Sequence, residues 1–439
     1  MSVTAAASLA RRLAREAVWH DGECTWIGRC PASSKGPVGF QPLGPDLFAG
    51  TAGIAWFLAE TYRATGEAAL RTAAIGALRH GERGSFLLRG EKRISLHTGA
   101  AGIALAAAIV ATRTGDAEAA ASATRLIDGA ISAASPRHPR DLVTGSAGTI
   151  IAATAIAEML SVPRLLERAS GLARALVAAA ERTEDGISWT SPGRSRYRNL
   201  TGMAHGASGI AVALLSLFAA TGELRWREAA LDAFRYERSL FDRRRANWPD
   251  LSHVLRTRPL RNPPFLTWWC HGAPGIALAR IRASEILGDG PWQEEAREGL
   301  GTTLSALRSD LDRDSTEPSL CHGLAGNAAI LLDGLPYLAS GERKRARVEV
   351  ARAARAALRI VTNEPIEMPS LLTGAAGVGW LALRMGGAPV ASPLIVRPER
   401  LAPPQACSFR SFRKGPRARA SQGRADRREE VRTPGRFPC

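Results

Sequence analysis

Apolar, alanine-rich segments alternate along this chain with amphipathic ones. Segments such as Ile54–Ala64 and Ile103–Ala111 carry few charged side chains on any face. Stretches such as Asp116–Ala134 and Arg343–Val361 carry Arg and Glu on one face, as surface helices do. Helices that are apolar all round belong inside a protein. The alternation therefore predicts an inner and an outer set of helices.

A Gly-x-x-Gly element precedes each apolar segment and recurs at intervals of 46 to 66 residues. Its seven copies are Gly50-Gly53, Gly99-Gly102, Gly145-Gly148, Gly206-Gly209, Gly272-Gly275, Gly323-Gly326 and Gly374-Gly377. Four apolar segments end at a glycine that could cap a helix, namely Gly66, Gly115, Gly222 and Gly288. One repeat is thus a helical hairpin. Seven hairpins predict an all-α fold, and a closed α/α toroid (barrel) buries the apolar helices better than an open solenoid.

The repeat places chemically useful side chains in matching positions. Cys270 and Cys321 both lie two residues before the first glycine, and His205, His271 and His322 lie directly before it in three consecutive repeats. If equivalent loops meet at the axis of a ring, these side chains converge. Two cysteines and a histidine suit zinc, and three ligands leave a fourth position open, as catalytic sites do.

We therefore predict one zinc ion per chain, held by Cys270, Cys321 and His322. The alternative is that three buried residues share this register by chance. His97 occupies the cysteine position of the second repeat, but since it stands alone we expect it to be structural.

Three motifs carry a resemblance to a known family: Ala204–Gly209 (AHGASG), Trp269–Gly275 (WCHGAPG) and Cys321–Asn327 (CHGLAGN). With them the chain resembles the LanC-like lanthionine synthetases, the cyclases of lanthipeptide biosynthesis, over roughly residues 40 to 396. The stretches Tyr236–Phe241 and Asn247–Leu251 look closest to the cyclase domains that class II enzymes carry behind a dehydratase. Because the first repeat begins by Gly50, we expect no dehydratase domain ahead of it.

The resemblance implies that a peptide cysteine thiol adds to dehydroalanine or dehydrobutyrine and closes a thioether ring. It implies that His205 is the acid that protonates the resulting enolate and that Asp141 orients His205. The structural alternative for His205 is a hydrogen bond at a helix start. For Asp141 the alternatives are an N-cap or a pair with Arg140. His271 would be a further acid-base group or a supporting donor. Nisin-type cyclases have an arginine where this chain has Leu266, which leaves enolate stabilisation unassigned.

Partners follow from the same resemblance: a dehydrated precursor peptide and a separate dehydratase. Two other functions remain open. An α/α-toroid glycosidase needs two facing carboxylates, and Asp141 has no obvious partner. A non-catalytic scaffold that binds zinc and a thiol peptide or glutathione would use the same ligands as the enzyme.

Composition indicates in which cellular compartment the protein is expected. The 439 residues have a net charge of +17, and the apolar runs are shorter than the ~20 residues of a membrane span. Residues 1–20 are interrupted by Arg11 and Arg12, so we expect an amphipathic helix on the outer ring and no signal peptide. The six cysteines do not suggest a disulfide framework, and we expect a cytoplasmic protein.

The connections differ in length and composition. Residues 21–46 are rich in Gly, Pro and Ser and suggest a loop, in which Cys24 and Cys30 are ordinary thiols. The long segments Thr183–Tyr197 and Phe241–Leu266 are expected to cover a site. We assign residues 1–396 to the toroid domain, with repeats from about residue 40.

Residues 397–439 hold 12 basic and 4 acidic residues with many prolines, and we expect a disordered tail. No nucleic-acid-binding motif accompanies this charge, so no nucleic-acid partner is predicted.

Overall fold

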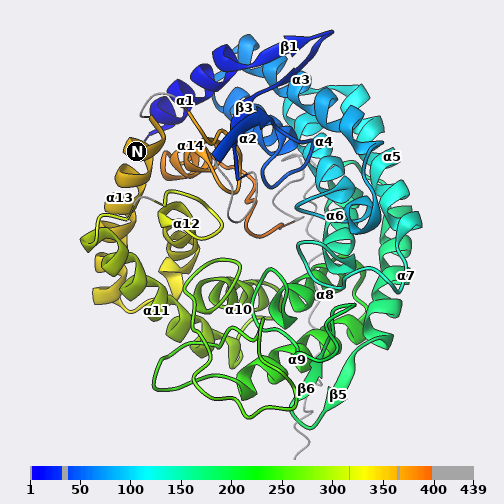
Figure 1. Ribbon diagram of the computed structural model, residues 1–439, viewed down its shortest axis with the longest axis vertical. Helices are drawn as coiled ribbons and strands as arrows, with labels where there is room; N and C mark the ends of the chain where they lie inside the picture. The colour runs from blue at the N-terminus through cyan, green and yellow to red at the C-terminus, as the bar shows by residue number, and fades with distance from the viewer. Residues whose placement is uncertain (1, 32–37, 316, 363–365, 398–439) are drawn as a thin grey trace, which may run out of the picture. The chain divides into compact units, whose positions relative to one another are not determined.

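Two concentric rings of helices make up the protein (Figure 1). The computed structural model describes residues 2–31, 38–315, 317–362 and 366–397, which contain fourteen α-helices. The inner helices are α2 (Thr51–Thr65), α4 (Ala100–Thr114), α6 (Ser146–Met159), α8 (Ala207–Thr221), α10 (Ala273–Leu287), α12 (Leu324–Gly334) and α14 (Ala375–Met385). The outer helices are α1 (Val3–Glu16), α3 (Ala68–Ser85), α5 (Ala117–Ala133), α7 (Arg164–Ala178), α9 (Leu224–Ser239), α11 (Trp292–Asp312) and α13 (Ser340–Thr362). The predicted all-α toroid of seven hairpins is confirmed.

The two ends of the helical array close the ring. Six inner helices pair with the outer helix that follows them, whereas α14 packs against α1 from the start of the chain. Helix α1 begins after Ser2, whose side chain accepts a hydrogen bond from the amide of Ala5, and it buries Leu9 and Leu13. The predicted outer-ring helix is therefore the missing half of the seventh hairpin.

Glycine precedes all seven inner helices, and a glycine with positive φ ends four of them. A Cβ atom on Gly102 would lie 1.8 Å from the carbonyl oxygen of Leu96 and 2.9 Å from Cβ of Leu47 in the preceding repeat. Only a residue without a side chain allows this approach. At the other end, Gly66 caps α2 with φ of 74°, as the spacing of the glycines predicts.

In the part of the chain that the structure describes, six short strands form three antiparallel pairs: β1 (Val18–His20) with β2 (Glu23–Thr25), β3 (Ile27–Pro31) with β4 (Val38–Pro42), and β5 (Glu181–Thr183) with β6 (Gly186–Ser188). The prediction of a loop over residues 21–46 is therefore wrong. Asp21 and Gly22, both with positive φ, form the two-residue turn that joins β1 to β2. An Asp-Gly pair is a strong hairpin signal, and the surrounding glycines and prolines obscured it.

The segment that follows α14, drawn in orange in Figure 1, crosses the interior of the ring. Within this segment Ala391 accepts a hydrogen bond from the indole of Trp380, and Leu394 accepts one from the indole of Trp269. Arg397 then pairs with Glu285 at the end of α10. The segment thus enters the ring, reaches the level of the loops before the inner helices, and turns back.

The predicted basic tail beyond Arg397 lies outside the described residues. Among the described helices, none is long and apolar enough to cross a membrane.

Candidate metal centre

A ring of backbone hydrogen bonds joins the loops that precede the inner helices. It uses the residue two before the first glycine of each repeat: Phe48, His97, Val143, Ala204, Cys270, Cys321 and Leu372. Six bonds of 2.8 to 3.2 Å connect neighbours in this series. Equivalent loops therefore converge on the axis, as the register predicts.

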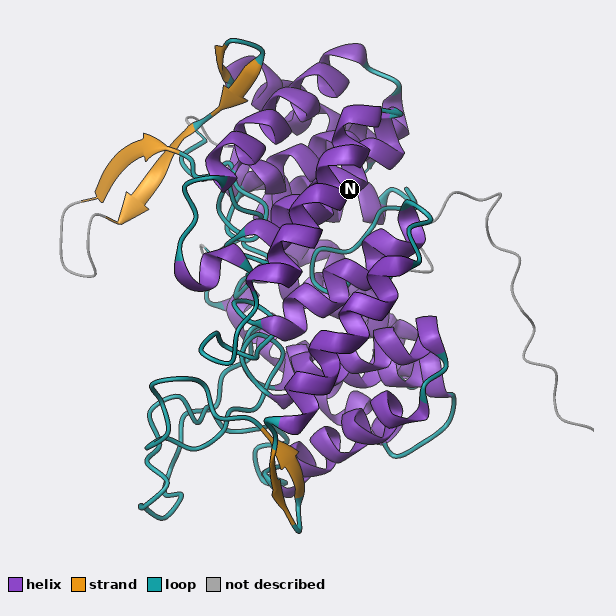
Figure 2. Cartoon of the chain, turned by 90° about the vertical axis from the view of Figure 1, so that its right-hand side faces the viewer, coloured by secondary structure: helices purple, strands orange, loops and turns teal. Residues whose placement is uncertain are grey.

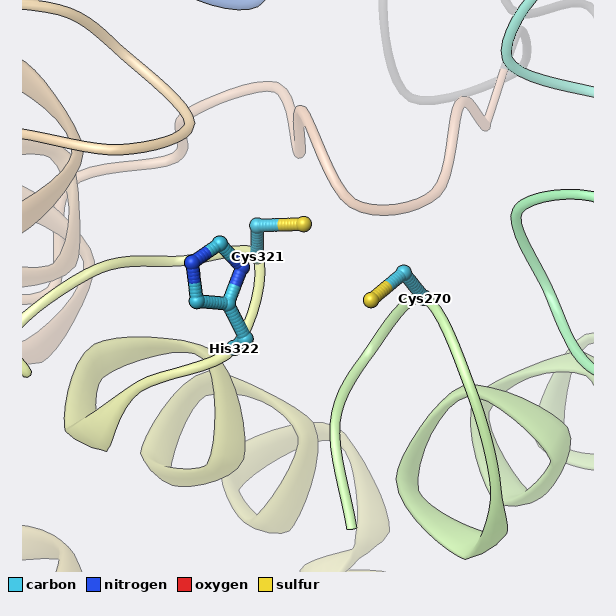
Figure 3. A group of neighbouring side chains, drawn as sticks. All are labelled: Cys270, Cys321 and His322. Carbon is cyan, nitrogen blue, oxygen red and sulfur yellow. The ribbon is translucent and has the colours of Figure 1, made fainter. Parts of the chain in front are cut away.

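The ring of bonds is open at one place among the described residues, between Cys270 and Cys321. There the side chain of Asn327 in α12 donates instead to the carbonyl oxygen of Thr267, at 3.0 Å. This side-chain link holds the two loops together without drawing their backbones into direct contact. The ligand atoms of Cys270, Cys321 and His322 lie within 4.8 Å of one another (Figure 3).

These three side chains fit a zinc ion. Zinc takes thiolate sulfur at about 2.3 Å and imidazole nitrogen at about 2.0 Å, so donors grouped within 4.8 Å can share one ion after small side-chain movements. Cys321 is buried, while Cys270 and His322 are partly exposed. The donor set supplies three of four tetrahedral positions and leaves the fourth for a thiol or water.

The loop that carries Cys270 is held in place by Asn247, which lies in the connection that follows α9. The side chain of Asn247 donates to the carbonyl oxygen of Leu266 and accepts from the amide of Ala273, at 3.0 and 2.8 Å. Gly272 closes the turn with φ of 88°, and its hypothetical Cβ would lie 1.8 Å from the carbonyl oxygen of Leu266. Cys270 is thus presented at the tip of a tight turn directly before α10.

The surroundings favour thiolate at Cys270. Hydrogen bonding to Cys321, followed by that to His322, lowers the pKa of Cys270 to about 5. The same interactions place the proton on the partners: they raise the pKa of Cys321, because its thiol faces the Cys270 charge, and the pKa of His322. A thiol with a lowered pKa ionises more readily and therefore binds a metal ion more readily.

His205 and Asp141 form a pair beside the cysteines. The Nδ1 atom of His205 lies 3.1 Å from a carboxylate oxygen of Asp141. Burial opposes the charge of His205, but the hydrogen bond to Asp141 and the negative charges of Asp141 and Cys270 outweigh it and raise its pKa. Asp141 also accepts from the amide of Thr144 at 2.7 Å, in the turn before α6. The N-cap of α6 is Gly145 and no side chain caps the helix, so the alternative of an N-cap role for Asp141 is wrong.

His271 and His97 occupy different surroundings. The rings of His271 and His205 are 6.1 Å apart, and the Nδ1 atom of His271 lies 3.8 Å from a carboxylate oxygen of Asp250. His97 is 2% exposed and lies 5.2 Å from the ring of Trp269. Its burial, with the nearby charge of His205, lowers its pKa to about 4, so His97 is neutral at neutral pH.

The structure brings together the six residues that we predicted for the site, and their individual roles stay a prediction. It adds Asn247, Asn327 and Asp250, which sequence reasoning did not place in the site. Asn327 ends the third motif, and Asn247 and Asp250 both lie within the stretch that resembles class II cyclases, so all three had a signal. Nothing in the local sequence connects Asp250 with His271.

Comparison with known families agrees with this picture. The family model described as "Lanthionine synthetase C-like protein" matches residues 41–388. The chain belongs to this family of LanC-like proteins, as the three motifs suggest.

A solved structure with this fold is nisin cyclase. Nisin cyclase superposes with a TM-score of 0.59 at 18% sequence identity, covering 77% of this chain and 88% of that one. A Listeria innocua protein gives a TM-score of 0.47 at 13% identity, covering 88% and 97%. The GH76A alpha-1,6-mannanase of Salegentibacter sp. HEL1_6 gives 0.40 at 12% identity, covering 70% and 86%.

Proposed function

We propose that this protein is a zinc-dependent lanthipeptide cyclase. It would add cysteine thiols of a dehydrated precursor peptide to dehydroalanine or dehydrobutyrine, forming thioether rings. The observation that carries the proposal is the grouping of Cys270, Cys321 and His322 next to an acid-base pair, His205 and Asp141. Family membership and the fold shared with nisin cyclase support it.

Cys270, Cys321 and His322 would hold the metal. A zinc ion bound there would take the substrate thiol in its open position and lower the pKa of that thiol from about 8.5, so that thiolate exists at neutral pH. Hydrogen bonds from Asn247 and Asn327 hold the loops that carry these ligands in place. The ligands would therefore need to move only a little to bind the metal.

His205 would supply the proton that completes the addition. Attack of the sulfur on the β-carbon makes an enolate, and the Nε2–H of protonated His205 would donate to Cα. Asp141 accepts from Nδ1 and thereby orients the ring and stabilises its charged form. His271, with Asp250 beside it, would be a further proton carrier. Glycosidase chemistry finds less support, because the carboxylate of Asp141 is already engaged by His205 and Thr144.

Zinc content and ring formation test the proposal. We would measure zinc per chain, and then cyclisation of a dehydrated cysteine peptide, for the wild type and for Cys321→Ala, His205→Ala and Cys24→Ala. Cys24 is the matched control, because it is a buried free cysteine outside the metal centre, and burial raises its pKa to about 12.

One zinc per wild-type chain should be lost in Cys321→Ala and kept in Cys24→Ala and His205→Ala. Cyclisation should be abolished in Cys321→Ala and reduced at least about a hundredfold in His205→Ala, as for loss of a general acid. Zinc binding without cyclisation would indicate the non-catalytic scaffold. Wild-type protein without zinc would overturn the assignment of the metal ligands.

A further inference from the structure

Two long loops lie together on the side of the ring that carries the candidate site. Residues 189–201 precede α8, and residues 241–266 connect α9 to α10; Figure 2 shows long loops gathered on one side of the helices. The amide of Arg198 donates to Val254, and the amide of Arg256 donates to Arg196, at 2.8 and 3.0 Å. We call residues 189–201 and 241–266 the arginine layer.

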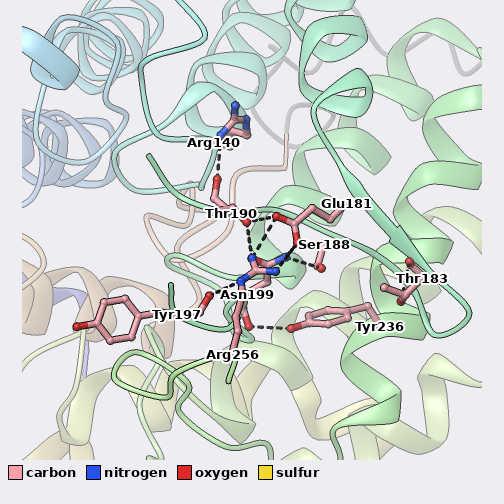
Figure 4. Close-up of polar contacts among 10 residues, drawn as sticks. Arg140, Glu181, Thr183, Ser188, Thr190, Tyr197, Asn199, Tyr236 and Arg256 are labelled. Atoms are coloured by element: carbon pink, nitrogen blue, oxygen red, sulfur yellow. Dashed lines mark hydrogen bonds and ion pairs between the residues drawn. The ribbon is translucent and has the colours of Figure 1, made fainter. Parts of the chain in front are cut away.

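A network of side chains fixes this layer (Figure 4). The guanidinium of Arg256 donates to Glu181, Thr190 and Asn199. The hydroxyl of Tyr236 in α9 donates to the backbone of Asn199 at 2.7 Å. The two loops are therefore fixed relative to each other and form one surface, on which the charged side chains have a defined arrangement.

The layer is strongly and almost uniformly positive. It contains nine arginines and two acidic residues, Asp242 and Asp250. Asp242 accepts from the amides of Arg244 and Arg245, and Asp250 accepts from the amide of Ser252. Both carboxylates are thus engaged with the backbone of their own loop. Within the described part of the chain, Arg256 is the one arginine of the layer that forms an ion pair, and its partner is Glu181.

Abundant arginine in the chain does not account for this pattern by itself. On the helices, arginines regularly have a carboxylate, as in the pairs Arg113–Glu60 and Arg384–Asp333. A cluster of like charges without counterions repels itself and attracts anions. The missing negative charge is therefore expected to come from a bound partner.

The layer adjoins the site. Asp250 lies 3.8 Å from His271, and the hydroxyl of Thr201 donates to Pro249 at 2.8 Å, which joins the two loops beside α8. Arg194 lies close enough for its charge to act on His205: like burial, it opposes the rise in the pKa of His205 that Asp141 causes. A peptide bound at the metal centre would extend over these loops.

We propose that the arginine layer binds an acidic segment of the peptide substrate and so holds the reacting part of the peptide at the metal centre. This inference rests on the proposed function for its partner being a peptide. Nucleic acid fits less well, since binding of single strands uses free aromatic faces for stacking. Here Tyr197 already stacks with Arg194 and Arg196, and Phe265 with Arg245.

The test is binding of a fluorescein-labelled hexaglutamate peptide to the full chain, followed by anisotropy at low salt, with a hexaglutamine peptide as the neutral probe. The first variant removes three exposed charges of the layer: Arg244→Gln, Arg258→Gln and Arg261→Gln. Its matched control removes three exposed charges from the outer helix α13: Arg345→Gln, Arg347→Gln and Arg355→Gln. A third variant replaces the same three layer arginines with lysine.

We expect the wild type to bind hexaglutamate and not hexaglutamine, with an affinity that falls as salt rises. Loss of three ion pairs should raise the Kd of the layer variant about tenfold, while the α13 variant stays near the wild type and the lysine variant recovers most of the affinity. Equal losses in the layer and α13 variants would overturn the proposal, because net charge or the basic tail would then be the binder.

A fluorescein-labelled oligonucleotide could instead bind more tightly than hexaglutamate and lose affinity in the layer variant. That result would overturn the proposal and indicate nucleic acid as the partner. Zinc content is measured on the same samples. A layer variant with normal zinc and unchanged hexaglutamate binding refutes the inference alone, whereas wild-type protein without zinc refutes the proposed function and leaves the binding result standing.

Discussion

Replacing Asp141 with Asn tests the acid-base pair most directly. Asparagine has nearly the same shape, and its side-chain oxygen can still accept from the amide of Thr144, as the carboxylate does at 2.7 Å. The substitution removes the negative charge next to His205, 3.1 Å from its Nδ1 atom. It should therefore change the chemistry of His205 and leave the turn before α6 in place.

The size of the effect follows from the contact that is lost. A hydrogen bond to a charged group contributes about 1.5–3 kcal/mol, which corresponds to roughly 10- to 150-fold in rate if the charged imidazole is formed before proton transfer. The side chain of His205 is 36% exposed, and water screens part of the interaction. We therefore expect a loss near the lower end, about tenfold in kcat.

The pH dependence gives a sharper signature. Asp141 and Cys270 raise the pKa of His205 against the effect of burial, so Asp141→Asn should lower it. If His205 is the acid, activity falls as the pH rises through its pKa. The alkaline limb of kcat should then move to lower pH in the variant, measured by ring formation on a saturating dehydrated peptide.

Thr144→Val supplies the control, because it removes a hydroxyl that donates to Asp141 at 3.0 Å and keeps the charge. It should lower kcat less than Asp141→Asn and leave the alkaline limb where it is. If Asp141→Asn left both kcat and the limb unchanged, Asp141 would be a turn residue only, and the assignment of the pair would fall.

Three further predictions concern the scaffold and its titration. Glu237→Gln removes the charge of one of the two carboxylates that pair with the buried Arg280, the other being Glu295, and should cost about 1.5–3 kcal/mol of unfolding free energy in urea denaturation. Gly66→Ala, at φ of 74° with open space around it, should cost about 1–2 kcal/mol, whereas Gly102→Ala should prevent folding into soluble protein. Because the folded pKa of His205 is raised, its stabilisation is present below about pH 6.5 and lost as the pH rises through the folded value. The melting temperature should therefore fall more over that range in the wild type than in His205→Gln.

Much of the architecture could be predicted from local pattern, since each step needs only neighbouring residues. The apolar segments, the Gly-x-x-Gly elements and the capping glycines such as Gly66 indicate helices, their ends and their order. The same spacing places Cys270 and Cys321 in one register. The Asp21-Gly22 pair is a local turn signal for its hairpin, although many other glycines and prolines surround it.

Other features depend on contacts between distant parts of the chain. The indole of Trp269 donates a hydrogen bond to Leu394, which lies 125 residues further along the chain. The side chain of Asn327 donates to Thr267, 60 residues away. The pairing of α1 with α14 has the same character, because it joins the two ends of the helical array. No local periodicity encodes which partner such a group will find.

By itself, then, the sequence determined the helical repeat, the ring and the residue types of the metal centre, because hydrophobic periodicity and glycine geometry act within one repeat. The tertiary structure alone decided that the backbone ring opens between Cys270 and Cys321 and that Asp141 meets His205 across 64 residues. It also decided that eight arginines of two loops gather without forming an ion pair among the described residues. Each of these features depends on contacts between loops that are far apart in the sequence, and such contacts form only when the chain folds.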